Sequence, residues 1–280
     1  MEFRNRLRRV RRSEPPEENG PGPVREPQRQ LRPFLWNRIV GLSLLPFVWI
    51  FGKALCDTLT HAHLPASQQG GSLWFSYDFL MFAAGGLLWL LLFFAGLKFW
   101  NVPPLLRAYV FGHELMHTLM ARLSRGRIRE YRISSEGGYI VTDKYNFIIA
   151  LAPYLWPFYS VAVLALWATS YFWEDPLQYR EWFLGALGFT WMFHFTFTVW
   201  ILPHGQTDFH GPGRIFSYLF IIIANTIFLS GALILLAPDV TWHDYGSALK
   251  KDSLEFYSAA GRALAWLFHY VTGIVRDVAG

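Results

Sequence analysis

Charged residues and cysteine are scarce in this sequence. Charged side chains make up 16% of the 280 residues, against about 25% in soluble globular domains. The shortage comes from long apolar stretches between short polar loops, which argues against an ordinary soluble domain. The single cysteine, Cys56, excludes an internal disulfide and a metal centre built from several thiolates.

Apolar stretches of about 20 residues predict membrane-spanning helices. Five such stretches cover residues 37–56, 74–100, 146–173, 180–202 and 214–237. Pro153 and Pro157 are expected to bend the third. Residues 247–276 have a helical, amphipathic pattern, which predicts either a helix on the membrane surface or a weak sixth span. The 13 Trp and 13 Tyr residues fit the aromatic belts of membrane interfaces.

The net charge of +5 is concentrated at the N-terminus, where six arginines lie between Arg4 and Arg12. Residues 1–33 are rich in Arg, Pro and Glu and lack an apolar run, which predicts a disordered cytosolic tail without a cleavable signal peptide. Because a span follows, we expect this basic cluster to face anionic lipid headgroups, and we expect no nucleic-acid partner. The loop 57–72 has no Lys or Arg and is expected on the opposite face. The compact chain suggests a bacterial inner membrane protein with a cytosolic N-terminus.

Residues 105–123 have helical periodicity but contain five ionisable side chains, which makes them a poor lipid-facing span. The arginine-rich loop that follows is expected in the cytosol. We therefore predict a short helix that packs into the bundle from the cytosolic side. Residues 128–143 then predict two short strands around a turn that contains Gly137 and Gly138.

Residues 113–117 read His-Glu-Leu-Met-His, an H-E-x-x-H pattern. On a helix, residues i and i+4 lie on one face, so His113 and His117 can bind one zinc ion at about 2.0–2.1 Å from each nitrogen. Glu114 can then act as general base toward a water molecule whose pKa the metal lowers to about 7. So short a pattern also arises by chance. Burying two His and a Glu in an apolar bundle is costly without a partner, however, which favours a metal site.

A catalytic zinc site normally has a third protein ligand. The polar loop 203–213 offers His204, Asp208 and His210. Two predicted spans carry the chain out and back before this loop, so it is expected on the same side as the H-E-x-x-H helix. The alternative for each of the three is a solvated loop residue that binds no metal. His194, within a predicted span, is expected to be a packed histidine or a group beside the ligands.

The segment FGHELMHTLMA (residues 111–121) resembles the zinc-binding helix of the site-2 protease class of intramembrane zinc metalloproteases, in particular its compact bacterial branch. The resemblance covers about residues 100–220. Members carry a second motif of the type Leu-Asp-Gly-Gly-Arg, whose Asp is the third zinc ligand. Here Asp208 occupies that place, with an insertion before Gly211-Pro212-Gly213-Arg214. The resemblance therefore implies His113, His117 and Asp208 as zinc ligands and Glu114 as the catalytic residue.

One family feature is missing. An Ala-Gly-Pro sequence with a downstream Asn appears here as Leu151-Ala152-Pro153-Tyr154 without a matching Asn, and Asn146 and Asn225 are weak substitutes. The strand pair gains a role from the resemblance, because an edge strand near the zinc can hold a substrate chain extended. A surface hairpin without substrate contact is the alternative.

These observations predict an all-α polytopic membrane protein with about five to six transmembrane helices, a zinc-motif helix and a small β-hairpin insert. Residues 34–237 are expected to form the membrane-embedded metalloprotease domain, and residues 238–280 an amphipathic C-terminal helix or extra span. The expected activity is zinc-dependent hydrolysis of peptide bonds in a membrane-protein substrate. A zinc transporter and a non-catalytic relative that binds membrane proteins are the alternatives, although the second has no need for Glu114.

Overall fold

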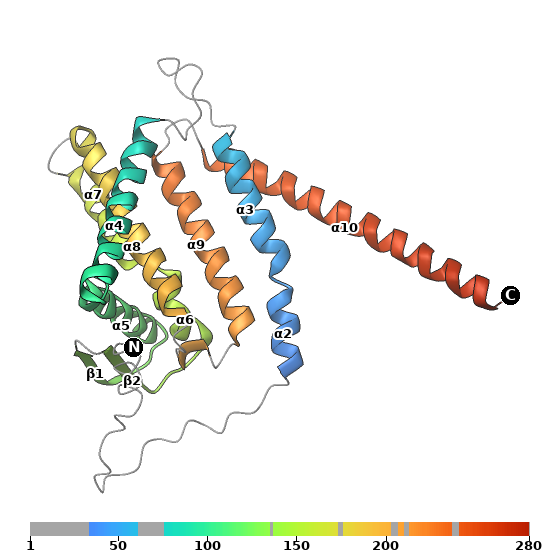
Figure 1. Ribbon diagram of the computed structural model, residues 1–280, viewed down its shortest axis with the longest axis horizontal. Helices are drawn as coiled ribbons and strands as arrows, with labels where there is room; N and C mark the ends of the chain where they lie inside the picture. Colours follow the sequence, from blue (N-terminus) through green and yellow to red (C-terminus); the bar gives the residue numbers. More distant parts are fainter. Residues whose placement is uncertain are drawn as a thin grey trace, which may run out of the picture. The chain divides into compact units, whose positions relative to one another are not determined.

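The structure, a computed structural model, describes residues 34–60, 76–134, 137–172, 176–202, 207–209, 213–236 and 241–279. Most of these residues are helical (Figure 1). The predicted N-terminal tail, residues 1–33, lies outside the described residues, as do His204 and His210.

The helices are α2 (Phe34–Leu42), α3 (Leu45–Thr60), α4 (Tyr77–Trp100), α5 (Leu106–Leu123), α6 (Phe147–Leu155), α7 (Phe158–Ser170), α8 (Arg180–Ile201), α9 (Arg214–Leu236) and α10 (Trp242–Ala279). Strands β1 (Ile128–Ser134) and β2 (Gly137–Thr142) lie between α5 and α6 in the sequence. Short 3-10 helices at Pro176–Tyr179 and Thr207–Phe209 precede α8 and α9.

Four stretches of helix are long and apolar enough to cross a membrane: Arg38–Thr60, Tyr77–Trp100, Arg180–Ile201 and Arg214–Ile234. The count becomes five if the bent pair α6 and α7 forms one span. The described residues thus carry the helices of a multi-pass membrane protein. Neither α5 nor α10 belongs to this set. Helix α5 contains the charged residues Arg107, Glu114 and Arg122, and α10 is too polar along its length. The upper end of the predicted range, six spans, is therefore not reached in the part of the chain that the structure describes.

The bend predicted in the third apolar stretch is present at Pro157, whereas Pro153 lies inside α6 and does not end that helix. The axes of α6 and α7 differ by 67°, and Trp156 and Pro157 separate the two helices. Pro157 has no backbone N–H to donate and therefore cannot continue the hydrogen-bond ladder of α6. Asn146 caps the start of α6, because its Oδ1 accepts a 2.8 Å hydrogen bond from the backbone N–H of Ile149. The bend gives the short helix α6 a direction of its own beside α5.

Helices α4 and α8 pack with their backbones in contact at glycines. A Cβ atom added to Gly85 would overlap the carbonyl oxygen of Gly185, and one added to Gly188 would overlap the carbonyl oxygen of Phe82. Small residues permit this close approach between membrane helices, whose association depends on packing rather than on exclusion of water. The pair α4 and α8 therefore forms a closely packed support for the helices around it.

The predicted pair of strands is confirmed as an antiparallel hairpin. Tyr131 pairs with Ile140 and Ser134 with Gly137, so that Gly137 and Gly138 belong to β2 and not to the turn as the sequence suggested. An irregularity between Ile128 and Glu130 ends the regular register. Both strands contact α5, beside which they lie in Figure 1.

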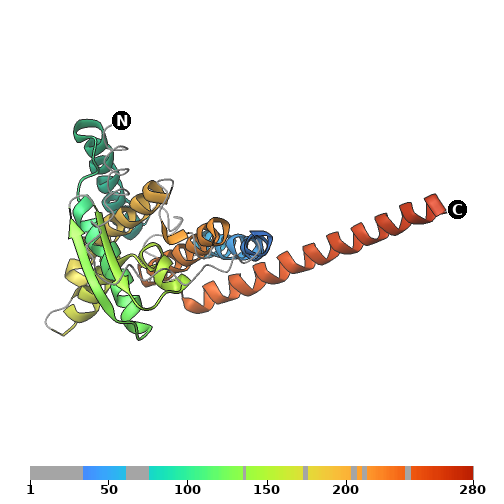
Figure 2. The same cartoon turned by 90° about the horizontal axis from the view of Figure 1, so that it is seen from below.

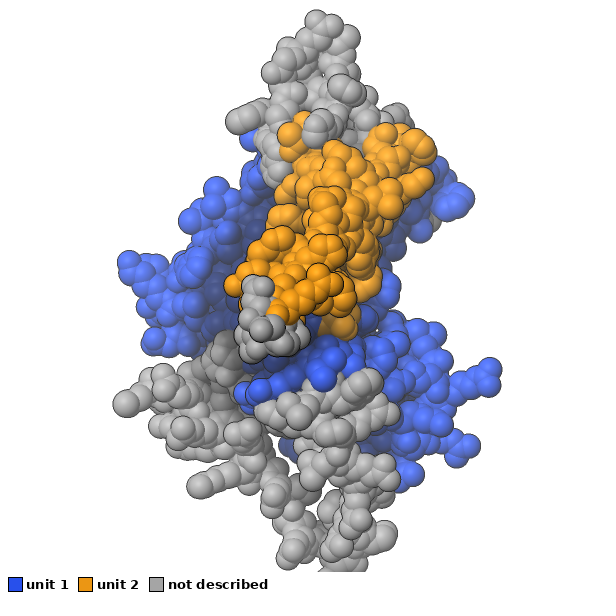
Figure 3. All heavy atoms as spheres, turned by 90° about the vertical axis from the view of Figure 1, so that its right-hand side faces the viewer, with its two compact units in different colours: residues 1–42, 77–221 blue, residues 43–76, 222–280 orange. Residues whose placement is uncertain are grey.

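The chain divides into two compact units, which Figure 3 shows in different colours. The described residues of the first unit come from 34–42 and 77–221, and those of the second from 43–76 and 222–279. The first unit contains α4 to α8 and the hairpin. The second contains α3, α10 and most of α9. The division predicted from the sequence, at residues 33/34 and 237/238, is a different one and stays a prediction.

Candidate metal centre

Helix α5 is held in place by an aromatic cluster one turn before the H-E-x-x-H motif. The cluster consists of the buried residues Trp89, Phe93, Tyr109, Phe193 and Phe197, which come from α4, α5 and α8. Tyr109 stacks on Phe197 with ring centroids 4.4 Å apart and an interplanar angle of 12°. Stacked aromatic pairs contribute about 0.5–1.5 kcal/mol beyond the burial of their surface. The rotation of α5 about its axis is thereby fixed.

A close approach of α7 adds a second restraint on α5. A Cβ atom added to Gly112 would lie 3.0 Å from Cε2 of Tyr159, so a larger residue would push the two helices apart. The hydroxyl of Tyr159 donates a 2.6 Å hydrogen bond to the carbonyl oxygen of Ala108. These contacts lie within one and a half turns of His113.

The two imidazoles of the motif face each other. The Nε2 atoms of His113 and His117 lie 3.2 Å apart, and the planes of the rings are 80° apart. Nδ1 of His117 lies 2.8 Å from the carbonyl oxygen of Ile149 in α6, and since a carbonyl only accepts, Nδ1 carries the proton. Nδ1 of His113 lies 3.4 Å from the hydroxyl of Tyr109. The Nε2 lone pair of His117 is therefore directed toward His113, which is the arrangement typical of histidine metal ligands.

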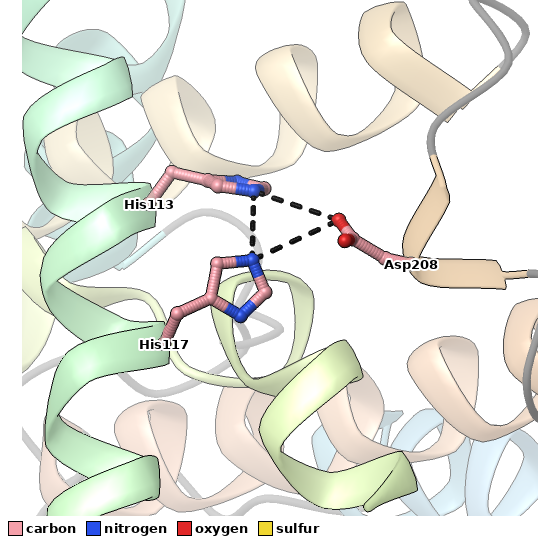
Figure 4. A group of neighbouring side chains, drawn as sticks. All are labelled: His113, His117 and Asp208. Carbon is pink, nitrogen blue, oxygen red and sulfur yellow. Dashed lines mark hydrogen bonds and ion pairs between the residues drawn. The ribbon is translucent and has the colours of Figure 1, made fainter. Parts of the chain in front are cut away.

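Asp208 brings a carboxylate to these rings from the 3-10 helix Thr207–Phe209 (Figure 4). Its Oδ2 atom lies 3.6 Å from Nε2 of His113 and 3.8 Å from Nε2 of His117. The hydroxyl of Tyr154 donates a 2.8 Å hydrogen bond to the same Oδ2. Burial opposes ionisation of Asp208, but the two imidazoles and Tyr154 outweigh it and hold the carboxyl pKa below its ordinary value.

The three atoms have the separations that a zinc ion requires. Because the distances are 3.2, 3.6 and 3.8 Å, the atoms lie on a circle of about 2.1 Å radius, and one point lies about 2.1 Å from all three. Zinc bonds to imidazole nitrogen and carboxylate oxygen have this length. Among the described residues, these three form the one group of at least three possible ligand side chains. The donor set fits zinc, with a coordination position left for water or a substrate oxygen.

No family model, curated protein or solved structure matches this chain.

The charge states of the motif residues follow from their burial. Burial, with a further contribution from His113, lowers the pKa of His117 to about 4, so the ring is neutral at pH 7, the state that binds metals. Burial raises the pKa of the Glu114 carboxyl to about 7, with His113 acting against this shift and the charge of Asp208 adding to it. Glu114 is 6% exposed, so its surroundings are largely shielded from water.

Strand β2 lies directly against Glu114. A Cβ atom added to Gly138 would lie 2.5 Å from Cγ and 3.0 Å from Cδ of Glu114. Only a residue without a side chain leaves room for the glutamate at this point. The hairpin therefore forms part of the wall of the candidate site. Its strand β2 brings an extended backbone segment next to the carboxyl group of Glu114.

The structure thus brings together the three residues named from the sequence as ligands, with Glu114 beside them. His194, expected to be a packed histidine or a group beside the ligands, is buried in α8, and its Nε2 lies 3.3 Å from the carbonyl oxygen of Tyr154, as a packed histidine would. It is not among the three ligand candidates. Sequence reasoning missed the role of Tyr154, which follows Leu151-Ala152-Pro153 and contacts Asp208 directly. A polar hydroxyl in the apolar run 147–155 was the available signal.

Proposed function

We propose that this chain is a zinc-dependent endopeptidase that hydrolyses peptide bonds of membrane-associated proteins. The observation that carries the proposal is the convergence of His113, His117 and Asp208 on one point, with the buried carboxyl group of Glu114 next to them on α5. The candidate spans supply the context, because a site within a multi-pass protein meets its substrates at or in the bilayer. The resemblance of residues 111–121 to the site-2 protease class supports the same activity.

In this proposal His113, His117 and Asp208 hold the zinc ion. When bound, zinc supplies Lewis-acid polarisation of a carbonyl group and lowers the pKa of water to about 7. Tyr154 orients the Asp208 carboxylate, and the carbonyl of Ile149 orients His117. Such hydrogen bonds behind the ligands fix ring and carboxylate geometry before the metal arrives.

Glu114 carries out the proton transfers. It accepts a proton from the attacking water, whose oxygen forms a bond to the carbonyl carbon of the substrate. It then delivers that proton to the amide nitrogen as the carbon–nitrogen bond breaks, which releases a new amine and a new carboxylate. General acid–base catalysis of this kind contributes about 10²–10⁴-fold in rate.

Strand β2 is proposed to hold the substrate. A helical substrate hides its peptide bonds in intrahelical hydrogen bonds, so the segment to be cut must become extended. One edge of β2 pairs with β1, and within the described residues the sheet has only these two strands. An extended substrate segment can therefore add to the hairpin as a further strand. The contact between Gly138 and Glu114 supports this role over that of a remote surface hairpin.

The replacement Glu114→Gln tests the proposal. The wild type and the variant are expressed in membranes at equal levels, and new protein N-termini are identified by mass spectrometry. We expect cleavage products that require Glu114, while the variant keeps its zinc because Glu114 is not a ligand. Glu181→Gln, at an exposed hydrogen bond with Tyr77, is the matched control and should cleave normally. Equal sets of new N-termini from the wild type and Glu114→Gln would refute the assigned activity.

A zinc transporter is the rival function. Transport requires ligands along a path, whereas the described residues offer one group of three. Zinc uptake into vesicles that contain the purified protein separates the two functions, because only a transporter moves zinc across the bilayer. The cytosolic N-terminus and the contact of the arginine-rich tail with anionic headgroups stay predictions from the charge pattern, and the bacterial inner-membrane location stays a prediction from the compactness of the chain.

A further inference from the structure

Helix α10, the longest described helix with 38 residues, has its buried described residues near its start. Tyr245 and Asp252 are buried there. The ring of Trp242 lies against α9, since a Cβ atom added to Gly231 would be 3.1 Å from its Cη2 atom. Beyond this part, no other described element of the second unit lies beside α10 in either Figure 1 or Figure 2.

A group of charges fastens the start of α10 to α3. Lys53 of α3 forms ion pairs with Asp252 and Glu255 of α10 and with Asp57 of its own helix, at 3.5 Å for Glu255 and 2.9 Å for Asp57. The side chain of Asp252 is fully buried in this contact. Lys53 lies two turns before the end of the candidate span Arg38–Thr60. The start of α10 is therefore next to one end of a membrane span.

Large apolar side chains dominate the rest of α10 and are exposed. Leu264, Phe268 and Trp266 are 68%, 67% and 66% exposed. Further exposed members of this set are Leu267, Tyr270, Val271 and Ile274. An apolar surface of this extent on a described helix marks a site of interaction with a membrane or another protein.

The polar and apolar residues of this part occupy opposite sides of the helix. Arg262, His269 and Arg276 follow one another at intervals of seven residues, which keeps them within about 40° of one another. Leu264, Val271, Leu267, Ile274 and Phe268 spread over about 120° on the other side. Trp266 lies between the two sides.

We propose that residues 257–276 of α10 lie in the membrane interface. The apolar side with Leu264 and Val271 then lies in the acyl chains, and the basic side with Arg262 and Arg276 lies among lipid phosphates. Three features favour lipid. The ion pairs with Lys53 place the start of the helix beside a membrane span. The apolar side is wider than the narrow seam through which two coiled helices pair. A tryptophan at the boundary has the position that indole rings take at the headgroup level.

A transmembrane course is the less favourable alternative. Ionisable side chains inside a spanning helix are costly, and Arg262, His269 and Arg276 all lie on one side of this segment. On the membrane surface the same three side chains reach water and phosphate at little cost. The inference is independent of the proposed protease activity, because it uses no residue of the metal centre.

Site-directed labelling of the full chain tests this placement. In a Cys56→Ser background, single replacements Leu264→Cys and Val271→Cys place a nitroxide label on the apolar side, and Arg262→Cys and His269→Cys place one on the basic side. Leu91→Cys, at a 62% exposed position of the candidate span α4, calibrates contact with lipid. The protein is reconstituted in vesicles of phosphatidylcholine and phosphatidylglycerol, and access to oxygen and to a water-soluble nickel complex is measured.

We expect labels at positions 264 and 271 to prefer oxygen, at a depth of about 5–10 Å below the phosphates, and labels at 262 and 269 to prefer nickel. Nickel access at all four positions would place the helix in water and overturn the proposal. Oxygen preference at all four would show a span and would also overturn it. Spin–spin broadening at positions 264 and 271 would show a second copy of the chain instead of lipid, with the same consequence.

Discussion

The hydroxyl of Tyr154 can be removed without disturbing the packing around it. Tyr154 is 0% exposed, and Tyr154→Phe keeps the ring that contacts His113 and Phe209 at 5.2 and 5.0 Å between centroids. The variant loses the 2.8 Å hydrogen bond to Oδ2 of Asp208. That oxygen is also the proposed zinc ligand, so the carboxylate loses the group that orients it.

The size of the effect follows from the charge on the acceptor. A hydrogen bond to a charged group contributes about 1.5–3 kcal/mol, and each 1.4 kcal/mol changes a dissociation constant about tenfold. We therefore expect the zinc affinity of Tyr154→Phe to fall about 10- to 100-fold, the range found when groups behind metal ligands are removed. The fall should appear whether or not a substrate is present.

Competition with a chromophoric chelator in detergent solution measures the affinity. Tyr159→Phe is the matched control, since it removes a half-buried hydroxyl that donates to Ala108 and does not touch the three ligands. It should bind zinc as the wild type does. If Tyr154→Phe binds zinc within about twofold of wild type while Asp208→Ala loses it, the orienting role of this hydroxyl is wrong. If neither variant changes zinc binding, Asp208 is not a ligand.

Three further outcomes are expected. Gly138→Ala should lower the rate of cleavage but leave zinc affinity unchanged, because the added methyl group displaces Glu114. Gly52→Ala is the control for both assays, because a Cβ atom at Gly52 has no atom within 4 Å. Gly188→Ala should lower the thermal unfolding temperature in detergent by overpacking α4 against α8, at a cost of about 1–3 kcal/mol, and a temperature equal to that of Gly52→Ala would contradict the backbone contact. Lys53→Met should lower the unfolding temperature, because it leaves the buried carboxylate of Asp252 without its cation. The double replacement Lys53→Met with Asp252→Leu should recover most of the loss, and calorimetry that finds no difference between the single and double variants would refute this pairing.

The spans and the bend could be read from the sequence because both have local causes. A run of apolar residues predicts a membrane helix by its length, and Pro157 has no backbone N–H with which to continue the hydrogen bonds of α6. The placement of His113 and His117 on one side of α5 also has a local cause, since helical residues four apart lie on the same face. These features required no knowledge of how distant segments pack.

Contacts between segments far apart in the sequence were harder to predict from the sequence. Asp208 was one of three loop candidates until the resemblance to a family singled it out. Tyr154 is 54 residues away from it in the sequence, and no pattern of hydrophobicity links the two. The ion pair of Lys53 with Asp252 spans 199 residues and joins the C-terminal helix to α3, whereas the sequence had set residues 238–280 apart. Such pairs depend on tertiary packing, which periodicity does not encode.

The backbone contact between α4 and α8 restricts how a polypeptide could enter from the lipid. Two helices whose backbones are in contact at glycines leave no space for a third helix between them. Separating α4 from α8 would lose the packing contacts that hold the pair together. The side of the first unit that α4 and α8 form is therefore closed to a substrate helix at this contact. In the proposed protease, a membrane-embedded substrate would therefore have to reach His113 and His117 from another side of the first unit.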